Sequence, residues 1–294
     1  MAEVVVVGDA CLDVDIFPET RGAQSVVRSF LVAPAGSAGN VAITLTALGI
    51  NSLLLYPSGD DNVDDILSGM LSAIGQKFCK VRGEGYSCLV VNVISRRGAR
   101  RVYTSVGPRI SRFSCQVPRD ARFLHISGYL LELASPEVIK GILDGVGEET
   151  TISLDLFPRV GLVSRDVLEY FFKRVDILFG NESEFAALNL SSEAAVKSLL
   201  NRGLEAVVVK KGSRGAVSYS SEGVFSYRER VAVKSLKGAG DVFVASYLSG
   251  LRAGLSHNES LKIAVRNSAE HVAGGGPLNT VVRNVRLREG CPQL

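Results

Sequence analysis

A glycine-rich stretch in the last quarter of the chain has the composition of an anion site beside a proton acceptor. Residues 237–241 read KGAGD, and apolar residues with helical spacing follow at Phe243, Tyr247 and Leu251. Glycines let the backbone turn so that several N–H groups point outward at a helix start, where the helix dipole also favours an anion. A carboxylate there repels phosphate unless its role is to take a proton, so Asp241 is a candidate general base. The alternative is that Asp241 only caps the helix.

A second glycine-rich loop, residues 35–40 with the sequence AGSAGN, precedes an apolar helical segment closed by Gly49. Its simplest interpretation is a helix N-terminus with Asn40 as the cap. Polar groups also follow two apolar runs: Asp9 and Asp13 come after four valines, and residues 181–184 read NESE. The conjunction of these groups with two glycine loops favours a shared ligand site.

The elements that must position these residues alternate along the chain. Short β-branched or apolar runs indicate strands, and the segments between several of them have helical spacing, clearest over residues 63–74. This alternation predicts a mostly parallel sheet covered by helices on both faces, whose ligand crevice lies outside the carboxyl ends of the strands. The predicted strands are residues 4–7, 53–56, 89–94, 123–127, 151–156, 176–179 and 206–209.

Two segments, about 10–34 and 85–112, break the alternation. In the second, residues 88–94 and 101–105 flank a polar turn and predict a β-hairpin. We expect both excursions to form one small sheet that covers an end of the core, within a single domain of residues 1–294.

Four arginines in this predicted hairpin could bind an anionic substrate, because arginine pairs bind phosphate in a bidentate way. A solvated turn is the alternative that we favour, since exposed sheet edges commonly carry charge. The residues are Arg96, Arg97, Arg100 and Arg101.

Overall composition excludes several classes of protein. The 294 residues include 33 Lys or Arg and 30 Asp or Glu, a net charge of +3 that is too small to indicate a general nucleic-acid or membrane partner. Residues 1–8 lack a basic segment before the valines, so we expect no signal peptide, and no run reaches the roughly 18 apolar residues of a membrane span. Five cysteines, none in CxxC spacing, argue against zinc and thioredoxin-type sites and favour a reducing cytoplasm.

Motif spacing excludes further classes. The chain has no GxxxxGK[ST] loop, no GxGxxG after its first predicted strand, no protein-kinase HRD and DFG pair and no GxSxG nucleophile turn. His125, His257 and His271 lack metal-ligand spacing, so we expect each to be structural.

Together these motifs resemble the PfkB, or ribokinase-like, family of carbohydrate and nucleoside kinases. Residues 35–42 (AGSAGNVA) are similar to its N-terminal signature and residues 238–241 to its GAGD signature, in the same order and about 200 residues apart. Residues 181–184 resemble its NxxE motif, and residues 211–215 (KGSRG) resemble its nucleotide loop. The resemblance covers nearly the whole chain. It implies a three-layer α/β/α core with a β-sheet lid, and ATP-dependent phosphorylation of a hydroxyl, usually a primary alcohol of a sugar or nucleoside.

The resemblance also implies roles for individual residues. Asp241 would take the hydroxyl proton while the Gly238, Ala239 and Gly240 amides stabilise the moving phosphoryl group. Asn181 and Glu184 would organise Mg²⁺ through water, since magnesium dehydrates reluctantly. The nucleotide would lie against Lys210, Gly212 and Gly215, with Asn267 near the adenine, and the substrate hydroxyls would bind Asp13, Gly36, Ser37 and Asn40.

Two departures from the family pattern affect these expectations. The family often has Asp-Thr-x before GAGD, associated with a monovalent-cation site, whereas residues 235–237 here read SLK, which argues against potassium activation. Residues 155–159 (DLFPR) resemble a DxNxR element but place Phe157 where the asparagine stands.

Several alternatives stay open on sequence alone. The chain could be a sugar kinase, a nucleoside kinase of the same fold or a sugar- or nucleotide-binding regulator without catalysis; oligonucleotide binding through the arginine hairpin has least support because the net charge is small. A lid sheet with exposed edges could pair with a second copy to form a homodimer.

Overall fold

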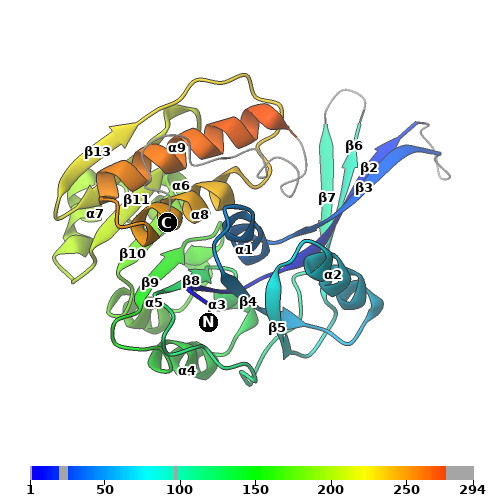
Figure 1. Ribbon diagram of the computed structural model, residues 1–294, viewed down its shortest axis with the longest axis horizontal. Coiled ribbons are helices and arrows are strands. Elements are labelled where there is room, and N and C mark those ends of the chain that lie inside the picture. Colours follow the sequence, from blue (N-terminus) through cyan, green and yellow to red (C-terminus); the bar gives the residue numbers. More distant parts are fainter. Residues whose placement is uncertain (1, 20–25, 96–98, 276–294) are drawn as a thin grey trace.

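The computed structural model describes residues 2–19, 26–95 and 99–275. Its main sheet has nine strands in the order β13-β12-β11-β10-β9-β8-β1-β4-β5 (Figure 1). The strands from β11 to β5 are parallel, and β12 and β13 add an antiparallel edge. The strands are β1 (Val4–Val7), β4 (Ser52–Ser58), β5 (Lys77–Arg82), β8 (Phe123–Ser127), β9 (Thr151–Asp155), β10 (Ile177–Asn181), β11 (Ala206–Lys210), β12 (Ala216–Ser220) and β13 (Gly223–Tyr227).

Helices cover both faces of this sheet, so the predicted three-layer architecture is confirmed. Val4 and Val6 of β1 face one apolar core, and Val5 and Val7 face the other, as the period of a strand requires. Helices α1 (Ser37–Ala47), α2 (Asn62–Ala73), α8 (Ala239–Arg252) and α9 (His257–Gly274) pack into the first core. Helices α3 (Leu130–Leu133), α4 (Pro136–Asp144), α5 (Arg165–Phe172), α6 (Glu182–Ala187) and α7 (Glu193–Leu200) pack into the second, and short 3₁₀ turns occupy Val160–Leu162 and Gly212–Arg214.

Local sequence sets the helix boundaries. Ser135 caps α4 by accepting a hydrogen bond from the Val138 N–H, and Pro136 takes the first helical position, where no N–H is needed. Ser256 and Glu259 form a capping box at the start of α9.

The two predicted excursions form a separate four-stranded sheet, which we call the lid. Its strands are β2 (Cys11–Pro18), β3 (Val27–Ala35), β6 (Cys88–Ile94) and β7 (Arg100–Thr104), in the order β3-β2-β6-β7. The lid projects from one side of the main sheet (Figure 1).

Two of the four hairpin arginines, Arg96 and Arg97, lie outside the described residues. Arg100 donates from Nε and from one terminal nitrogen to the Asn92 side-chain oxygen, so this arginine is engaged within the lid.

The cysteine count gives no support for a reducing compartment, because the structure pairs four of the five cysteines. Cys11 and Cys88 occupy matching positions on the neighbouring strands β2 and β6 and form one disulfide, and Cys79 and Cys115 form another. Sequence spacing could not show either pair, since the fold brings the partners together.

Within the described residues, no helix is both long and apolar enough to span a membrane.

Candidate active site

Most of the predicted site residues meet at the carboxyl ends of five adjacent parallel strands, β1 and β8 to β11. The chain leaves β1 toward β4 and β5 on one side, and β8 to β11 lie on the other, so β1 stands at a topological switch point. Ligands of open α/β sheets bind at such a point. A cleft of about 580 Å³ lies there, and its lining includes these predicted residues: Asp13, Gly36, Ser37, Asn40, Asn181, Glu184, Lys210, Gly212, Gly240 and Asp241.

The two glycine-rich loops meet at the Asp241 carboxylate. The Ser37 hydroxyl donates to one carboxylate oxygen at 3.0 Å, and the Asn40 side-chain amide donates to the other at 2.7 Å. Asn40 therefore does not cap α1; the N-cap position is Gly36. Asp241 does not cap α8 either, because it lies in the first turn after the N-cap Gly238. Both side chains instead face the cleft between two helix N-termini.

The surroundings of Asp241 suit a proton acceptor. The pKa of Asp241 is raised to about 7, chiefly by burial and also by the charge of Asp155, while the bonds from Asn40 and Ser37 and the charge of Lys210 act in the opposite direction. A general base is most effective when its pKa lies near the working pH.

Several backbone amides are unpaired at the start of α8, where the sequence predicts an anion site. Among the described residues, the N–H groups of Gly238, Gly240 and Asp241 have no hydrogen-bond partner, whereas the Ala239 N–H donates to the Leu236 carbonyl at 3.3 Å. Gly238 has a φ of 74°, a left-handed conformation that favours glycine. The free amides are therefore those of Gly238, Gly240 and Asp241 rather than of Ala239.

Asp9 has a supporting role that the sequence did not reveal. Its carboxylate accepts hydrogen bonds from the backbone N–H groups of Ser37 and Ala38 and from the Ser127 hydroxyl, so it caps α1 from the end of β1. Gly36 permits this close approach, because a Cβ there would lie 2.6 Å from the Asp9 carbonyl oxygen. Asp9 thus fixes the helix that carries Ser37 and Asn40.

Lys210 places a buried cation beside the amides. Its ammonium group donates to both Asp155 carboxylate oxygens, at 2.7 and 2.8 Å, and lies 3.6 Å from where a Cβ on Gly240 would stand. Burial works against the charge, but the nearby carboxylates of Asp155, Glu184 and Asp241 outweigh it and raise the pKa of Lys210. The lysine therefore stays protonated at the end of the cleft where a phosphate would bind.

Asn181 and Glu184 form a capping box at the start of α6. The Asn181 side-chain oxygen accepts from the Glu184 N–H at 2.9 Å, and Oε2 of Glu184 accepts from the Asn181 N–H at 2.8 Å. The second carboxylate oxygen of Glu184 has no hydrogen-bond partner within the described part of the chain, and Glu184 lines the cleft. Burial raises the pKa of this carboxyl, with a further contribution from Asp155.

An adjoining cavity of about 630 Å³ shares Gly212 with the cleft and is largely apolar. Gly215 also lines it, and a Cβ there would lie 1.9 Å from the Tyr227 carbonyl oxygen, so this position requires glycine.

Asn267 is not brought to either cavity. It is buried between α9 and α8, where its amide donates to the Ser246 hydroxyl at 3.1 Å. Its neighbours Ser268 and Ala269 line the cavity instead.

Comparison with known proteins agrees with this geometry. A family model described as pfkB family carbohydrate kinase matches residues 1–282. The chain belongs to the pfkB family of carbohydrate kinases. It is therefore an enzyme of the class that transfers a phosphoryl group to a sugar hydroxyl.

Individual relatives of this kinase are distant. A 5-dehydro-2-deoxygluconokinase of Bacillus subtilis (strain 168) is 23% identical over 282 residues, covering 88% of this chain and 86% of the relative. An ATP-dependent ribose-1-phosphate kinase of Halopiger xanaduensis is 28% identical over 251 residues, covering 82% and 80%. The solved structure of Arabidopsis thaliana ribokinase complexed with ribose and ATP aligns with a TM-score of 0.76 at 19% identity, covering 97% of this kinase and 99% of that chain. At that identity the match shows the shared fold.

Sequence reasoning missed a contact between Asp13 of the lid and the anion loop of the kinase. Lys237 forms an ion pair with Asp13 and lies 3.1 Å from an Asp15 carboxylate oxygen. The buried Asn92 amide donates to the other Asp13 oxygen at 2.6 Å. The lysine directly before the GAGD sequence was the available signal for this contact.

The Phe157 departure has a simple structural outcome. Phe157 is fully buried in the apolar core, while its neighbour Arg159 bonds to Glu132 through two nitrogens. Asp155 of this element forms an ion pair with Lys210, and both Asp155 and Arg159 line the cleft.

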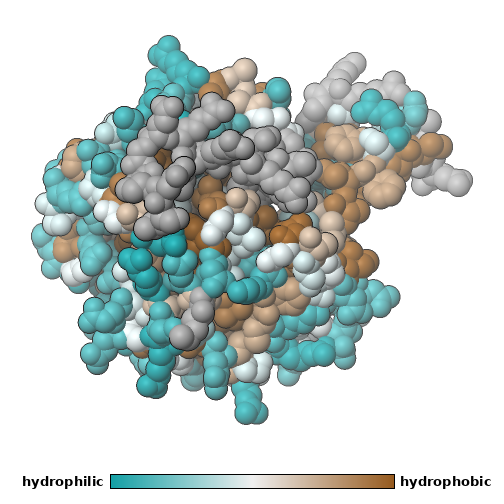
Figure 2. Space-filling model, in the orientation of Figure 1, coloured by the Kyte–Doolittle hydropathy of each residue, from teal (hydrophilic) through white to brown (hydrophobic). Residues whose placement is uncertain are grey.

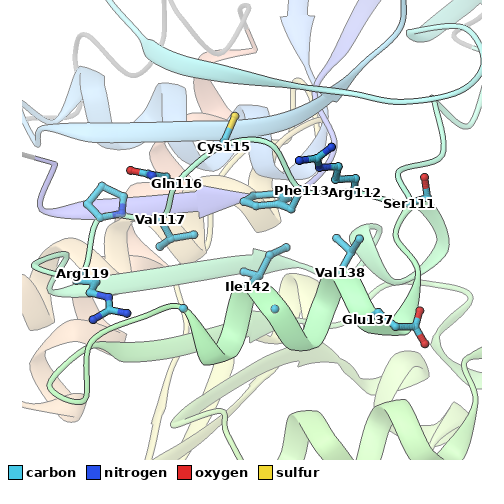
Figure 3. Close-up of a pocket in the computed structure, with 13 residues that line it drawn as sticks. Ser111, Arg112, Phe113, Cys115, Gln116, Val117, Arg119, Glu137, Val138 and Ile142 are labelled. Atoms are coloured by element: carbon cyan, nitrogen blue, oxygen red, sulfur yellow. The ribbon is translucent and has the colours of Figure 1, made fainter.

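A larger hollow, of about 960 Å³, lies between α4 and residues 111–119. Val138 and Ile142 of α4 face Phe113 and Val117 across it (Figure 3). None of the predicted site residues line this hollow, so convergent polar groups, and not size, mark the other cleft as the candidate active site.

Proposed function

We propose that this kinase transfers the γ-phosphoryl group of ATP to a hydroxyl of a sugar or sugar derivative, with Asp241 as the general base. The observation that carries the proposal is the position of Asp241, which is held by Ser37 and Asn40 and has a pKa of about 7 beside the unpaired amides of Gly238 and Gly240. Phosphoryl transfer to an alcohol needs a base for the hydroxyl proton and a site that stabilises the charge of the phosphoryl group. Here both lie within one turn of helix.

Each group has a defined part in this proposal. Asp241 takes the proton of the attacking hydroxyl, and the Gly238 and Gly240 amides hold the negative charge of the moving phosphoryl group. Lys210 adds positive charge beside Gly240. Because such transfers need little covalent help from protein, positioning and charge account for most of the rate.

The acceptor binds on the lid side of Asp241 in this proposal. Asp13 and Asn40 line that part of the cleft together with Gly36 and Ser37, and their carboxylate and amide groups can hold sugar hydroxyls. Asp13 keeps free acceptor positions, since a carboxylate offers about four and its two bonds come from Lys237 and Asn92. These groups also suit the ribose of a nucleoside.

Nucleotide and metal occupy the opposite end. The apolar cavity at Gly212 and Gly215 would take the adenosine part of ATP. Glu184 and Asn181 would hold Mg²⁺ through water, and the free carboxylate oxygen of Glu184 fits that role. The described residues contain no group of three or more metal-binding side chains, but magnesium needs only one or two carboxylates with waters and substrate phosphates. When bound, the ion would neutralise phosphate charge.

A second copy of the chain would cover the lid in this proposal. Hydrophobic residues gather on the projecting lid (Figure 2), where Phe30 is 70% exposed and Val27, Leu31, Val102 and Tyr103 are also exposed. Exposed apolar patches of this kind mark interaction surfaces. We also place the kinase in the cytoplasm, where ATP is available.

The test is an ATP-consumption assay with purified protein, Mg²⁺ and a panel of neutral sugars, sugar phosphates, sugar acids and nucleosides. We expect turnover with at least one sugar or sugar derivative. Turnover confined to nucleosides would replace the sugar acceptor with a nucleoside, and ATP binding without turnover across the panel would favour a regulator. Oligonucleotide binding that weakens steeply with salt would instead support the arginine-hairpin alternative.

A further inference from the structure

Helix α9 donates two side-chain hydrogen bonds to the backbone of the anion loop. The Nε2 atom of His271 lies 2.7 Å from the Lys237 carbonyl oxygen, and the Ser268 hydroxyl donates to the Ala239 carbonyl oxygen at 2.8 Å. Both residues lie on one face of the helix, since they are three positions apart. Neither contact belongs to the groups that the proposed function assigns to catalysis.

These two contacts fix the directions of two particular amides. The structure has no cis peptide bonds, and in a trans peptide the C=O and the following N–H point in opposite directions. A donor on the Lys237 carbonyl therefore directs the Gly238 N–H away from α9, and a donor on the Ala239 carbonyl does the same for Gly240. Within the described residues, these are amides without a partner, whereas the Ala239 N–H between them is bonded to Leu236.

The hydrogen bonding of His271 argues against simple space filling. A carbonyl oxygen only accepts, so Nε2 must carry the ring hydrogen. The other nitrogen, Nδ1, is buried and has no hydrogen-bond partner among residues 2–19, 26–95 and 99–275. A buried polar atom without a partner is costly, and an apolar side chain would fill the space without that cost. Within the described part of the chain, the bond to the Lys237 carbonyl is thus the one hydrogen bond that the imidazole makes.

We propose that His271 and Ser268 are positioning residues for phosphoryl transfer, which orient the Gly238 and Gly240 amides toward the transferred group. This inference rests on the proposed function of the same site. Glycine has wide backbone freedom, so an anion hole built on Gly238 and Gly240 gains most from external anchors. Preorganised donors act mainly in the transition state, and donation to a carbonyl also strengthens the N–H of the same peptide.

The test compares variants at these two positions with matched controls. His271→Leu and Ser268→Ala should each lower kcat about 10- to 100-fold, somewhat less than the loss of a direct oxyanion donor. The KM for the acceptor should change less than about threefold in both variants, and so should the KM for ATP in His271→Leu, because His271 lines neither the cleft nor the adjoining cavity. His271→Gln keeps an N–H donor at a similar reach and should recover most of the lost kcat.

His257→Leu and Ser249→Ala serve as the controls. His257 is buried on the same helix and contacts the Tyr247 hydroxyl, and the Ser249 hydroxyl bonds to the Ser246 carbonyl, but neither touches the anion loop. These changes should lower the melting temperature without the selective loss in kcat. Equal kcat losses in the controls, or failure of His271→Gln to exceed His271→Leu, would assign His271 a purely structural role.

A binding measurement separates this inference from the proposed function. ADP with aluminium fluoride mimics the transferred phosphoryl group and needs no turnover, so calorimetry can follow it in every variant. Both variants should weaken binding of this complex by about the factor lost in kcat, and His271→Leu should leave the binding of ADP alone unchanged. Wild-type affinity in both variants would overturn the inference. A wild-type protein that binds the complex but phosphorylates no acceptor would contradict the proposed function instead.

Discussion

The side-chain amide of Asn40 donates a hydrogen bond to the carboxylate of Asp241 at 2.7 Å, across 201 positions of sequence. This contact joins the helix that would hold the acceptor to the helix that would hold the moving phosphoryl group. Because it favours the ionised carboxylate, it counteracts the effect of burial on the pKa of Asp241. The same bond therefore sets both the position and the proton affinity of the proposed base.

The pH dependence of turnover follows from this environment. With a pKa of about 7, Asp241 should give a rate that rises about tenfold per pH unit below that value and levels off above it. Removing the donor in Asn40→Ala should raise this pKa and move the rise to higher pH. Initial rates from about pH 5 to pH 9 measure it, with Thr46→Val at the far end of α1 as the control. An unshifted curve in Asn40→Ala would contradict the assignment.

The Lys210 pair should separate stability from activity. Lys210→Met leaves the Asp155 carboxylate buried without its partner and should lower the free energy of unfolding by about 3 kcal/mol. Adding Asp155→Asn should restore most of that stability but not the rate, because the cation beside Gly240 is still missing. Urea denaturation and kcat measure the two effects.

Lys80→Met is the control. It removes an ion pair with Asp64 in which the lysine is more exposed than Lys210, remote from the cleft, and it should leave kcat unchanged. Recovered activity in the double variant would show that the Lys210 charge is not needed.

The ionised Asp241 carboxylate should also lower the free energy of unfolding at neutral pH. Its pKa is raised in the folded state from an ordinary value of 3.8, so stability is lost as the pH rises from about 4 to about 7. Asp241→Asn removes this loss, and its gain in melting temperature over the wild type should be larger at pH 8 than at pH 5. Asp144→Asn is the control, and its change in melting temperature should depend on pH in the opposite direction. The reason is that a hydrogen bond from Tyr170 lowers the pKa of Asp144. An equal gain at both pH values would argue against a raised pKa for Asp241.

The lid proposal makes a prediction about assembly. Phe30→Glu puts a charge on the most exposed large hydrophobic residue of β3 and should convert a dimer into a monomer. Light scattering after size-exclusion chromatography measures the mass. Leu162→Glu changes an even more exposed residue outside the lid and should leave the mass unchanged. A wild-type monomer at micromolar concentration would remove the proposed interface.

Local sequence was sufficient to predict elements and to mark the two glycine loops. Strand and helix periods predicted the layered sheet, and glycine followed by a carboxylate predicted the anion site at residues 238–241. The contacts of Ser37 and Asn40 with Asp241 could not be derived from spacing, because strand order and helix packing bring them together. For that reason the sequence of this loop alone favoured Asn40 as a helix cap, whereas the structure shows it as a partner of the Asp241 carboxylate.

The position of Asn267 illustrates a second limit. Successive residues of a helix point about 100° apart, so a shift of one position separates a residue that lines a cavity from one buried in a helix interface. Asn267 bonds to Ser246, while the next residue, Ser268, reaches the anion loop. The rotation of α9 about its axis is set by its packing on α8, which no short motif encodes.

The single-turnover rate of phosphoryl transfer in Asp241→Asn tests the central claim most directly. Protein in excess over ATP, with saturating acceptor at pH 8, isolates the chemical step, and calorimetry of ATP binding serves as the check on folding and nucleotide affinity. We expect a rate about 10² to 10⁴ times below the wild type, with ATP affinity unchanged. A rate within a few-fold of the wild type would show that Asp241 does not take the proton.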